Sequence, residues 1–396
     1  MRNLQIVERL RLLALISLGI AIGINPARSL PIPVKPSQIA SPSPLKPTQP
    51  PSSALDEQLW QHSGDRTALL RAIDYSLRYL QTAQAVRAYQ NYPVKGITRD
   101  LVDRSLRRFK QLILSSRSAQ QLQTAVRREF VFYQSIGKDN RGTVSFTGYF
   151  EPVHTASQVR TPDYRYPLYR SPDLARLKTP HPTRLELEGK DGLQSNKGVL
   201  RGLELVWLHD RLEAFLVQVQ GSARLQLTDG TVMTIGVAAH THQPYTGIGR
   251  ELVKDGKLRL EDLNLPNVVQ HFQQHPDELD LYLPRNRRFV FFKNTQGAPA
   301  TGSLGVPVTA ERSIATDKSL MPPGAIALIQ TQMPILTANQ SLEQRPVSRF
   351  VLDQDTGGAI LGAGRVDVFM GSGKAAGDRA GLVNATGQLY YFLLKS

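Results

Sequence analysis

Apolar residues three or four positions apart recur between about residues 56 and 135 and predict helices there. One stripe falls on a single helical face and consists of Leu69, Ile73, Leu77 and Leu80. A second helix is predicted to follow Thr98, a suitable N-cap with Asp100 in the first turn. Its stripe consists of Val102, Leu106, Phe109 and Ile113. Both stripes are expected to face a core, and we assign them no chemistry.

From Gly137 onward the pattern changes to short runs of apolar residues that are typical of strands. Asp229 and Gly230 lie between two such runs and predict a hairpin turn. Residues 254–280 are predicted to be partly helical. Further strands are expected at residues 143–150, 203–208, 214–219, 289–292, 326–330, 350–352, 366–369 and 390–393. Many short strands with Gly and Pro turns favour barrels over a parallel α/β sheet.

The first 29 residues have the features of an export signal. Arg2, Arg9 and Arg11 precede an apolar run at residues 12–24, which is short for a membrane span and suits a signal peptide. An uncleaved membrane anchor is the alternative. Residues 30–55 are rich in Pro and Ser and predict an extended linker. We therefore expect an exported protein of the periplasm or cell envelope, with association with the outer membrane or the wall.

Length and composition narrow the class of protein. A chain of 396 residues suggests two domains. Its net charge of +15 favours acidic partners, but no block of five Lys or Arg indicates a nucleic-acid-binding arm. The absence of cysteine excludes disulfides, thiolate metal sites, a cysteine nucleophile and a lipidated cysteine. We expect no nucleic acid among its partners.

Common catalytic and cofactor motifs are missing from the sequence. It contains no phosphate-binding G-x-x-x-x-G-K-[ST], no H-E-x-x-H and no G-x-S-x-G. His240 and His242 would share a strand face, but no third metal ligand is near them in sequence, so an ordinary surface pair is favoured. The Gly-Ser-Gly segment at residues 371–373 is weak evidence for a phosphate loop. No metal and no cofactor is expected.

Three aspartates among strand and turn residues form the densest candidate for chemistry: Asp317, Asp355 and Asp367. For the first two, a role in capping turns explains the residue type equally well. Asp367 is different because valines flank it on both sides, and aspartate is a poor strand former. In a strand it would share a face with Arg365 and Phe369. A half-buried carboxyl beside an aromatic ring has its pKa raised towards the range of a general acid.

The segments around these aspartates resemble the three-aspartate domain of the membrane-bound lytic murein transglycosylase A family. They are residues 355–362 (DTGGAILG), 365–373 (RVDVFMGSG) and 376–381 (AGDRAG). Upstream segments match further signatures of the same family, in the same order. These are residues 146–152 (FTGYFEP), 217–222 (VQVQGS), 244–249 (PYTGIG), 288–292 (RFVFF) and 302–307 (GSLGVP). The resemblance extends from about residue 143 to residue 395.

The resemblance implies a mainly β fold with N-terminal helices, in which a double-psi β-barrel domain carries an inserted second β domain. The barrel would comprise residues 56–149 and 285–396, the insertion residues 150–284, and a glycan groove would lie between the two. The family cleaves the β-1,4 bond between N-acetylmuramic acid and N-acetylglucosamine and leaves 1,6-anhydromuramyl ends. The resemblance therefore implies a lytic exotransglycosylase that binds peptidoglycan glycan strands, and we expect a monomer.

The resemblance also implies roles for individual residues. Asp367 matches the single acid, and Asp355 and Asp317 match the aspartates that order the site. Because the sugar's own 6-hydroxyl attacks, one residue can protonate the leaving oxygen and later accept the hydroxyl proton. The substrate-binding positions would be Thr147, Tyr149, Glu151, Gln220, Gly221, Ser222, Tyr245, Gly357 and Gly358. Glu151 is equally explained as a turn partner before Pro152.

Two alternatives remain open from the sequence. One is a non-catalytic module that grips peptidoglycan with the same groove, its acids only hydrogen-bonding sugars. The other is a two-carboxylate hydrolase that uses Asp367 with Glu151 or Asp355.

Overall fold

The computed structural model describes residues 43–52, 56, 58–61, 65–195 and 198–395. The predicted signal peptide at residues 1–29 lies outside these residues, as does most of the predicted linker. Part of that linker is a strand, since β1 (Leu45–Thr48) pairs antiparallel with β2 (Phe130–Ser135) and Leu45 is buried. An extended linker is therefore the wrong description for residues 45–48. No helix among the described residues is long and apolar enough to cross a membrane.

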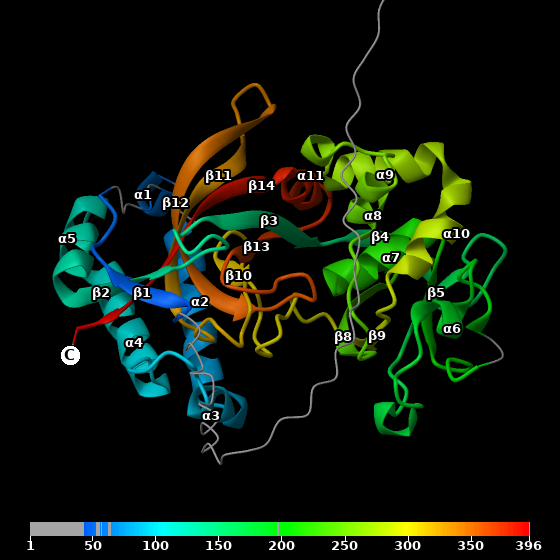
Figure 1. The fold of residues 1–396 in the computed structure, drawn as a ribbon, viewed down its shortest axis with the longest axis horizontal. Helices are drawn as coiled ribbons and strands as arrows, with labels where there is room; N and C mark the ends of the chain where they lie inside the picture. The colour runs from blue at the N-terminus through cyan, green and yellow to red at the C-terminus, as the bar shows by residue number, and fades with distance from the viewer. Residues whose placement is uncertain (1–42, 53–55, 57, 62–64, 196–197, 396) are drawn as a thin grey trace, which may run out of the picture. The chain divides into compact units, whose positions relative to one another are not determined.

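Helices occupy most of the N-terminal part, as the apolar spacing predicts (Figure 1). The Thr98 hydroxyl caps α4 by accepting a hydrogen bond from the Leu101 amide. Phe109 on α4 packs against Phe350 and Phe392, with ring centroids 5.0 and 5.1 Å away. The helices are α1 (Gln58–Gln61), α2 (Asp65–Leu80), α3 (Ala83–Gln90), α4 (Arg99–Ser115) and α5 (Ala119–Glu129). The helical region ends at Glu129, six residues earlier than predicted, because the apolar residues of β2 then join a sheet.

A closed ring of strands forms the larger sheet. The strand order is β1-β2-β14-β11-β12-β10-β13-β3, and an additional pairing of β14 with β3 closes the last six strands into a barrel. Besides β1 and β2, the strands are β3 (Val144–Glu151), β10 (Ser313–Ala315), β11 (Ile326–Leu336), β12 (Leu342–Asp355), β13 (Arg365–Ser372) and β14 (Asn384–Leu394). Helix α11 (Lys374–Leu382) packs on β3 and β13. The expectation of a mainly β fold built on a barrel, with helices at the N-terminus, is confirmed.

Gly387 lies where the barrel closes, opposite Val144 of β3. A Cβ atom there would be 2.1 Å from the Gln330 carbonyl oxygen and 2.8 Å from the Thr331 Cβ. We expect Gly387→Ala to lower the free energy of unfolding by about 1–3 kcal/mol, because neighbouring backbone must move apart. Urea denaturation measures this, with Gly198→Ala as the control, since a Cβ atom at Gly198 meets nothing within 4 Å. Equal midpoints for the two variants would contradict this packing.

The second sheet has the strand order β5-β6-β4-β7-β8-β9. Its strands are β4 (Val153–Ser157), β5 (Tyr166–Tyr169), β6 (Glu204–Leu208), β7 (Ser222–Leu227), β8 (Val232–His240) and β9 (Val290–Asn294). The predicted hairpin joins β7 and β8, with Gly230 at φ +85°. The helices of this part are α6 (Arg184–Glu188), α7 (Arg211–Gln220), α8 (Ile248–Lys254), α9 (Leu265–Gln274) and α10 (Leu279–Tyr282). Short 3-10 turns lie at Leu174–Arg176, Leu260–Asp262, Pro276–Glu278 and Leu283–Arg285.

In this second part of the chain, the structure differs from two expectations drawn from the sequence. The strand predicted at residues 214–219 is instead helix α7, which Asp210 caps through the Glu213 amide and Gly221 ends at φ +82°. Its buried Leu212, Phe215 and Val217 pack against the sheet and its helices. Strand β9 pairs with β8, so residues 290–294 join the second sheet, although the resemblance implied that the barrel domain resumes at residue 285.

Candidate functional site

Two parallel strands of the barrel, β3 and β13, present a row of side chains on one face, which are partly exposed except for the buried Phe369. Their register sets three pairs opposite each other: Ser145 and Arg365, Thr147 and Asp367, and Tyr149 and Phe369. The residues between them point the other way, and Val144, Phe146, Val366 and Val368 are buried in the barrel core. The two-residue period of a strand therefore places the predicted acid on the accessible face and keeps its valine neighbours inside.

Asp367 lies in the middle of this row and is half-buried. Burial raises the pKa of its carboxyl to about 6, helped by the negative charge of Asp355. A hydrogen bond from Thr147 and the positive charge of Arg365 hold the pKa below the value that burial alone would give. Its Oδ1 is buried and has no hydrogen-bond partner in the described part of the chain. A carboxyl with such a pKa can hold a proton and release it near neutral pH.

Asp355 is the last residue of β12, and a hydrogen bond from Tyr149 connects it to this row. The Tyr149 hydroxyl donates to Asp355 Oδ2 at 2.8 Å, and the amides of Ser303 and Thr356 donate to Oδ1 at 2.7 and 2.8 Å. Burial raises the pKa of Asp355, although these three hydrogen bonds act in the opposite direction. Both carboxylate oxygens are therefore occupied by groups of the protein itself.

The carboxylate of Asp317 makes its hydrogen bonds with Gly362 and Ser319. Its Oδ2 accepts a hydrogen bond from the Gly362 amide at 2.8 Å, and its Oδ1 accepts from the amide and hydroxyl of Ser319. Although burial acts in the opposite direction, these hydrogen bonds lower the pKa of Asp317. Since Gly362 belongs to the loop between Asp355 and Asp367, Asp317 fixes the loop that joins the other two aspartates.

Tyr245 approaches the same acid from the second part of the chain. Burial raises the pKa of Tyr245, and the charge of Asp367 raises it further. A Cβ atom at Gly358, in the loop after Asp355 that also contains Gly357, would lie 3.4 Å from the Tyr245 Cβ and 2.2 Å from Arg288 Nη1. Arg288 Nε donates to the Gln243 carbonyl at 2.9 Å. The lack of a side chain at Gly358 therefore lets the loop of Asp355 pack against Tyr245 and Arg288.

The remaining predicted positions lie at the far end of β3. Gln220 Oε1 accepts a hydrogen bond from the Phe150 amide at 3.0 Å and so ties the end of α7 to β3. Gly221 ends that helix, and the buried Ser222 begins β7. Glu151 is 2% exposed and accepts a hydrogen bond from the Ser372 hydroxyl at 2.6 Å, which joins β3 to β13. These contacts make Gln220 and Glu151 links between neighbouring elements.

The histidine pair is part of a small ring cluster. His242 stacks on His181 with ring centroids 4.2 Å apart, and the His242 amide donates to His181 Nδ1. His240 lies at 6.5 Å from His242, edge to face. Within the described ranges, no group of three His, Cys, Asp or Glu residues is arranged to hold a metal ion.

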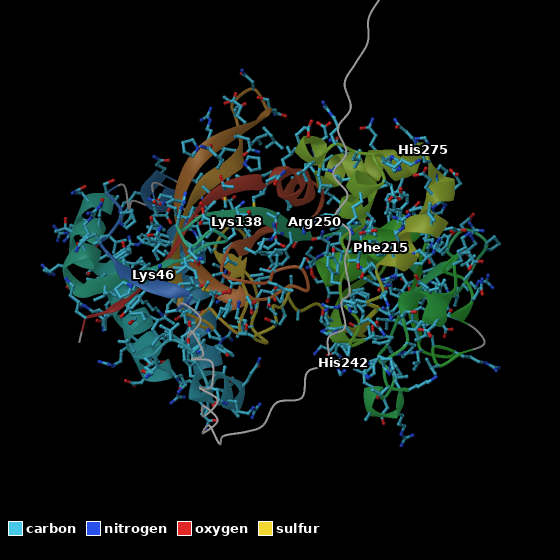
Figure 2. All side chains as sticks on the ribbon, in the orientation of Figure 1. Lys46, Lys138, Phe215, His242, Arg250 and His275 are labelled. Carbon is cyan, nitrogen blue, oxygen red and sulfur yellow. The ribbon has the colours of Figure 1, made fainter. Side chains whose placement is uncertain are left out.

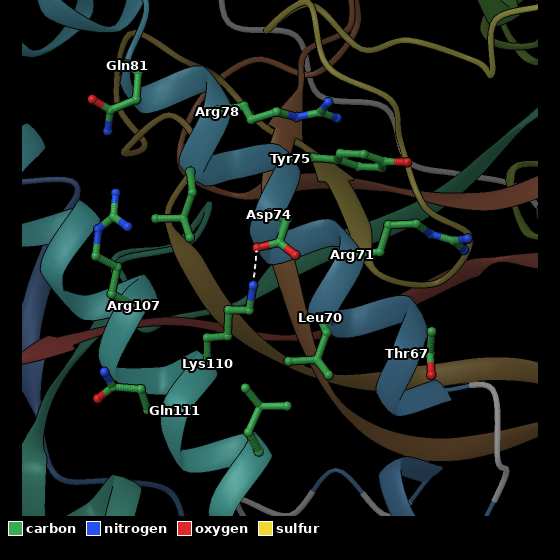
Figure 3. A pocket seen from close by; sticks show the side chains of 12 residues that line it. Thr67, Leu70, Arg71, Asp74, Tyr75, Arg78, Gln81, Arg107, Lys110 and Gln111 are labelled. Atoms are coloured by element: carbon green, nitrogen blue, oxygen red, sulfur yellow. Dashed lines mark hydrogen bonds and ion pairs between the residues drawn. The ribbon is translucent and has the colours of Figure 1, made fainter.

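A hollow of about 1010 Å³ lies between α2 and α4 (Figure 3). Asp74 and Lys110 form an ion pair of 2.5 Å across it, with Leu70 beside them. None of its lining residues belongs to β3 or β13. This hollow is therefore separate from the candidate site, which lies on the face of those two strands that carries Asp367.

Sequence reasoning missed two basic residues near the aspartates. Lys318 donates to Asp353 Oδ1 at 2.5 Å and to the backbone carbonyl of Asp355. Arg288 packs at the Asp355 loop, 70 residues away along the chain. Neither contact leaves a local pattern in the sequence, because both depend on how distant segments meet.

Comparisons with known proteins agree with this geometry. Family models match at residues 145–293, described as "MltA specific insert domain", and at residues 312–393, described as "3D domain". The chain is 32% identical to membrane-bound lytic murein transglycosylase A of Escherichia coli strain K12 over 262 residues, covering 65% of this chain and 68% of that protein. It is 30% identical to the Vibrio cholerae protein of the same name over 259 residues, covering 64% of this chain and 66% of that protein.

Solved structures give the same result. The crystal structure of E. coli MltA with bound chitohexaose superposes with a TM-score of 0.68 at 26% identity, covering 89% of this chain and 95% of that one. The membrane-bound lytic murein transglycosylase from Agrobacterium tumefaciens superposes with a TM-score of 0.65 at 26% identity, covering 83% and 93%. With the sequence relatives and the matched domains, these similarities show that the chain belongs to the membrane-bound lytic murein transglycosylase A family.

Proposed function

We propose that this protein is a lytic transglycosylase that cleaves peptidoglycan between N-acetylmuramic acid and N-acetylglucosamine, with Asp367 as its acid and base. The observation that carries the proposal is the Asp367 carboxyl on the open face of β3 and β13, with its pKa raised to about 6. Family membership supports the activity, and the environment of Asp367 supports the choice of residue.

In the first step, protonated Asp367 gives its proton to the oxygen between the two sugars as the glycosidic bond breaks. The muramyl C1 then carries the positive charge, and the 6-hydroxyl of the same sugar attacks it. Asp367, now a carboxylate, takes the proton of that hydroxyl, which closes the 1,6-anhydro ring and restores the acid. No water enters the product. Thr147 orients the carboxyl, and Tyr149 and Tyr245 offer aromatic faces to the sugar rings.

The hydrogen bonds of the other carboxylates argue against a two-carboxylate hydrolase. Such an enzyme needs a second carboxylate that attacks the sugar or activates water. Both oxygens of Asp355 accept hydrogen bonds from the protein, and Glu151 is buried against Ser372. Asp317 holds the Gly362 loop. We therefore assign Asp355 and Asp317 to ordering the site, and Glu151 to joining β3 and β13.

Location, partners and mode of attack complete the proposal. The relatives' names support association with the cell envelope, so we place the protein there, facing the glycan strands of peptidoglycan. The chitohexaose bound in the E. coli structure supports the binding of glycan strands, which we place along the face of β3 and β13 because Asp367 lies there. We further propose that the protein is exported, acts as a monomer and cleaves from strand ends.

The rate of cleavage should depend on pH through Asp367. The carboxyl must be protonated to act as acid, and its pKa is about 6. We expect kcat/KM to fall above about pH 6, approaching tenfold per pH unit because the protonated fraction falls by that factor. A pH–rate profile on purified peptidoglycan measures this. Rates that stay constant from pH 5 to pH 8 would contradict the role of Asp367.

Thr147→Val provides a matched test of the same pKa. The Thr147 hydrogen bond lowers the pKa of Asp367, so its loss should move the falling limb of the profile to higher pH. A limb that moves to lower pH, or not at all, would show that another group sets it.

Mass spectrometry of digested peptidoglycan separates the candidate activities. The proposal predicts muropeptides that are lighter by one water at the muramyl end. Ordinary reducing ends would instead indicate a hydrolase, and intact strands that still bind the protein would indicate a binding module.

A further inference from the structure

Arg365 is a partly exposed cation beside the proposed acid. It begins β13 and points to the same face as Asp367, two residues away. Its Nε is buried without a hydrogen-bond partner, and no ion pair in the described part of the chain includes it. Burial lowers the pKa of Arg365, although the negative charge of Asp367 acts in the opposite direction. A buried N–H group normally donates a hydrogen bond, so an Nε without an acceptor at this partly exposed residue is unusual.

Two further cations lie around Arg365. Arg250 of α8 is exposed (labelled in Figure 2), and its positive charge lowers the pKa of Arg365 further. Lys138 reaches Ser145, the strand partner of Arg365, with Nζ 3.4 Å from the hydroxyl. Asp139 follows Lys138 in sequence. Its carboxylate already accepts hydrogen bonds from the amides of Arg141 and Thr143 and from the Thr143 hydroxyl. Among these groups, positive charge exceeds negative charge.

We propose that Arg365, assisted by Arg250 and Lys138, binds a carboxylate that the muramyl sugar carries. This inference rests on the proposed function, because it takes the glycan to lie along β3 and β13. N-acetylglucosamine is neutral. N-acetylmuramic acid carries a lactyl group that ends in a free carboxylate or in a peptide with carboxylates of its own. A guanidinium holds a carboxylate through two parallel hydrogen bonds and thereby fixes its orientation.

The spacing along β13 suits this arrangement. Residues two apart on a strand are roughly 7 Å apart, which is comparable to the width of one sugar ring with its substituent. Arg365 can therefore reach a substituent of the sugar whose glycosidic oxygen Asp367 protonates. The site would then favour muramyl sugars over N-acetylglucosamine at the cleaved position through the charge of the carboxylate.

Binding measurements in the Asp367→Asn background test the proposal without turnover. Four ligands are compared. Chitohexaose has no carboxylate. The other three are peptidoglycan hexasaccharides: one with free lactyl carboxylates, one with these carboxyls converted to methylamides, and one with peptides attached to them. We expect Arg365→Gln to weaken binding of carboxylate-bearing strands about 10- to 100-fold. Binding of chitohexaose and of methylamide strands should change less than twofold. Arg365→Lys, which keeps the charge but not the paired hydrogen bonds, should give an intermediate loss.

The ligands also identify which carboxylate is bound. A loss with peptide-free strands assigns the site to the lactyl carboxylate, and a loss confined to peptide-bearing strands assigns it to the peptide; both support the proposal. An equal loss for chitohexaose, or no loss for any ligand, would overturn it. Arg71→Gln removes the same charge from exposed Arg71 on α2 and should leave all affinities unchanged. If the unmodified protein gave no anhydromuramyl products, the proposed cleavage would be refuted, but the binding comparison of the Arg365 variants could still be interpreted.

Discussion

Replacing Asp367 with asparagine is expected to lower the rate of peptidoglycan cleavage by about a thousandfold or more, the upper part of the range for loss of a general acid. Asparagine keeps the shape of the side chain but neither gives nor takes the proton. Because the account assigns both proton transfers to this residue, no other carboxylate should restore the rate. Turnover on purified peptidoglycan, measured by release of anhydromuropeptides, checks the prediction.

Two controls make this result specific. Asp378→Asn changes an exposed carboxylate that pairs with Lys374 on α11, and should leave cleavage nearly unchanged. Asp367→Asn itself should be no less stable than the unmodified protein at pH 7. The pKa of Asp367 is raised in the folded state, so the stability it contributes is present at low pH and is lost as pH rises through about 6. A variant that binds glycan, melts normally and still cleaves would refute the role of Asp367.

Arg312→Met should have the largest effect on stability, with a loss of about 3–5 kcal/mol in the free energy of unfolding. Arg312 is fully buried and pairs with buried Asp56 and with Asp65, at 3.0 Å for the latter, and it donates to the Phe350 carbonyl at 2.9 Å. Removing it leaves the carboxylates of Asp56 and Asp65, in the N-terminal helical part, without their main cation. Urea denaturation measures the loss.

Arg345→Met is the matched control, because Arg345 pairs with Glu343 at 3.0 Å on the exposed part of β12. Exposed pairs of this kind contribute about 0–1 kcal/mol. If both variants lost equal stability, the buried cluster around Arg312 would not be what joins Asp56 and Asp65 to the barrel.

The sequence predicts elements well where one local pattern decides the structure. The valines on either side of Asp367 predict a strand with one buried face, and that strand is β13. Thr98 and Asp229-Gly230 mark a helix start and a turn by their own chemistry. The same reasoning fails at residues 214–219, where a run of apolar residues suits either a strand or a buried helix. The capping residues Asp210 and Gly221 carried the signal that would have decided it.

The candidate site was only partly predictable, for a different reason. Asp367, Tyr149 and Asp355 could be named individually, but the hydrogen bond between the last two joins residues 206 positions apart. The approach of Arg288 to Gly358 and of Lys318 to Asp353 likewise depends on tertiary packing. Local periodicity contains no information on such contacts. The barrel ring creates them, since it brings β3 beside β13 across more than 200 residues.

In the proposed mechanism a single carboxyl, Asp367, cleaves the glycan without adding water. Digestion of peptidoglycan in water labelled with heavy oxygen, followed by mass spectrometry of the muramyl ends, tests it most directly. We expect anhydromuramyl ends that carry no label at C1, and about a thousandfold less of them from Asp367→Asn in the same time. Reducing ends labelled at C1 would show that water attacks the sugar, and would contradict the account.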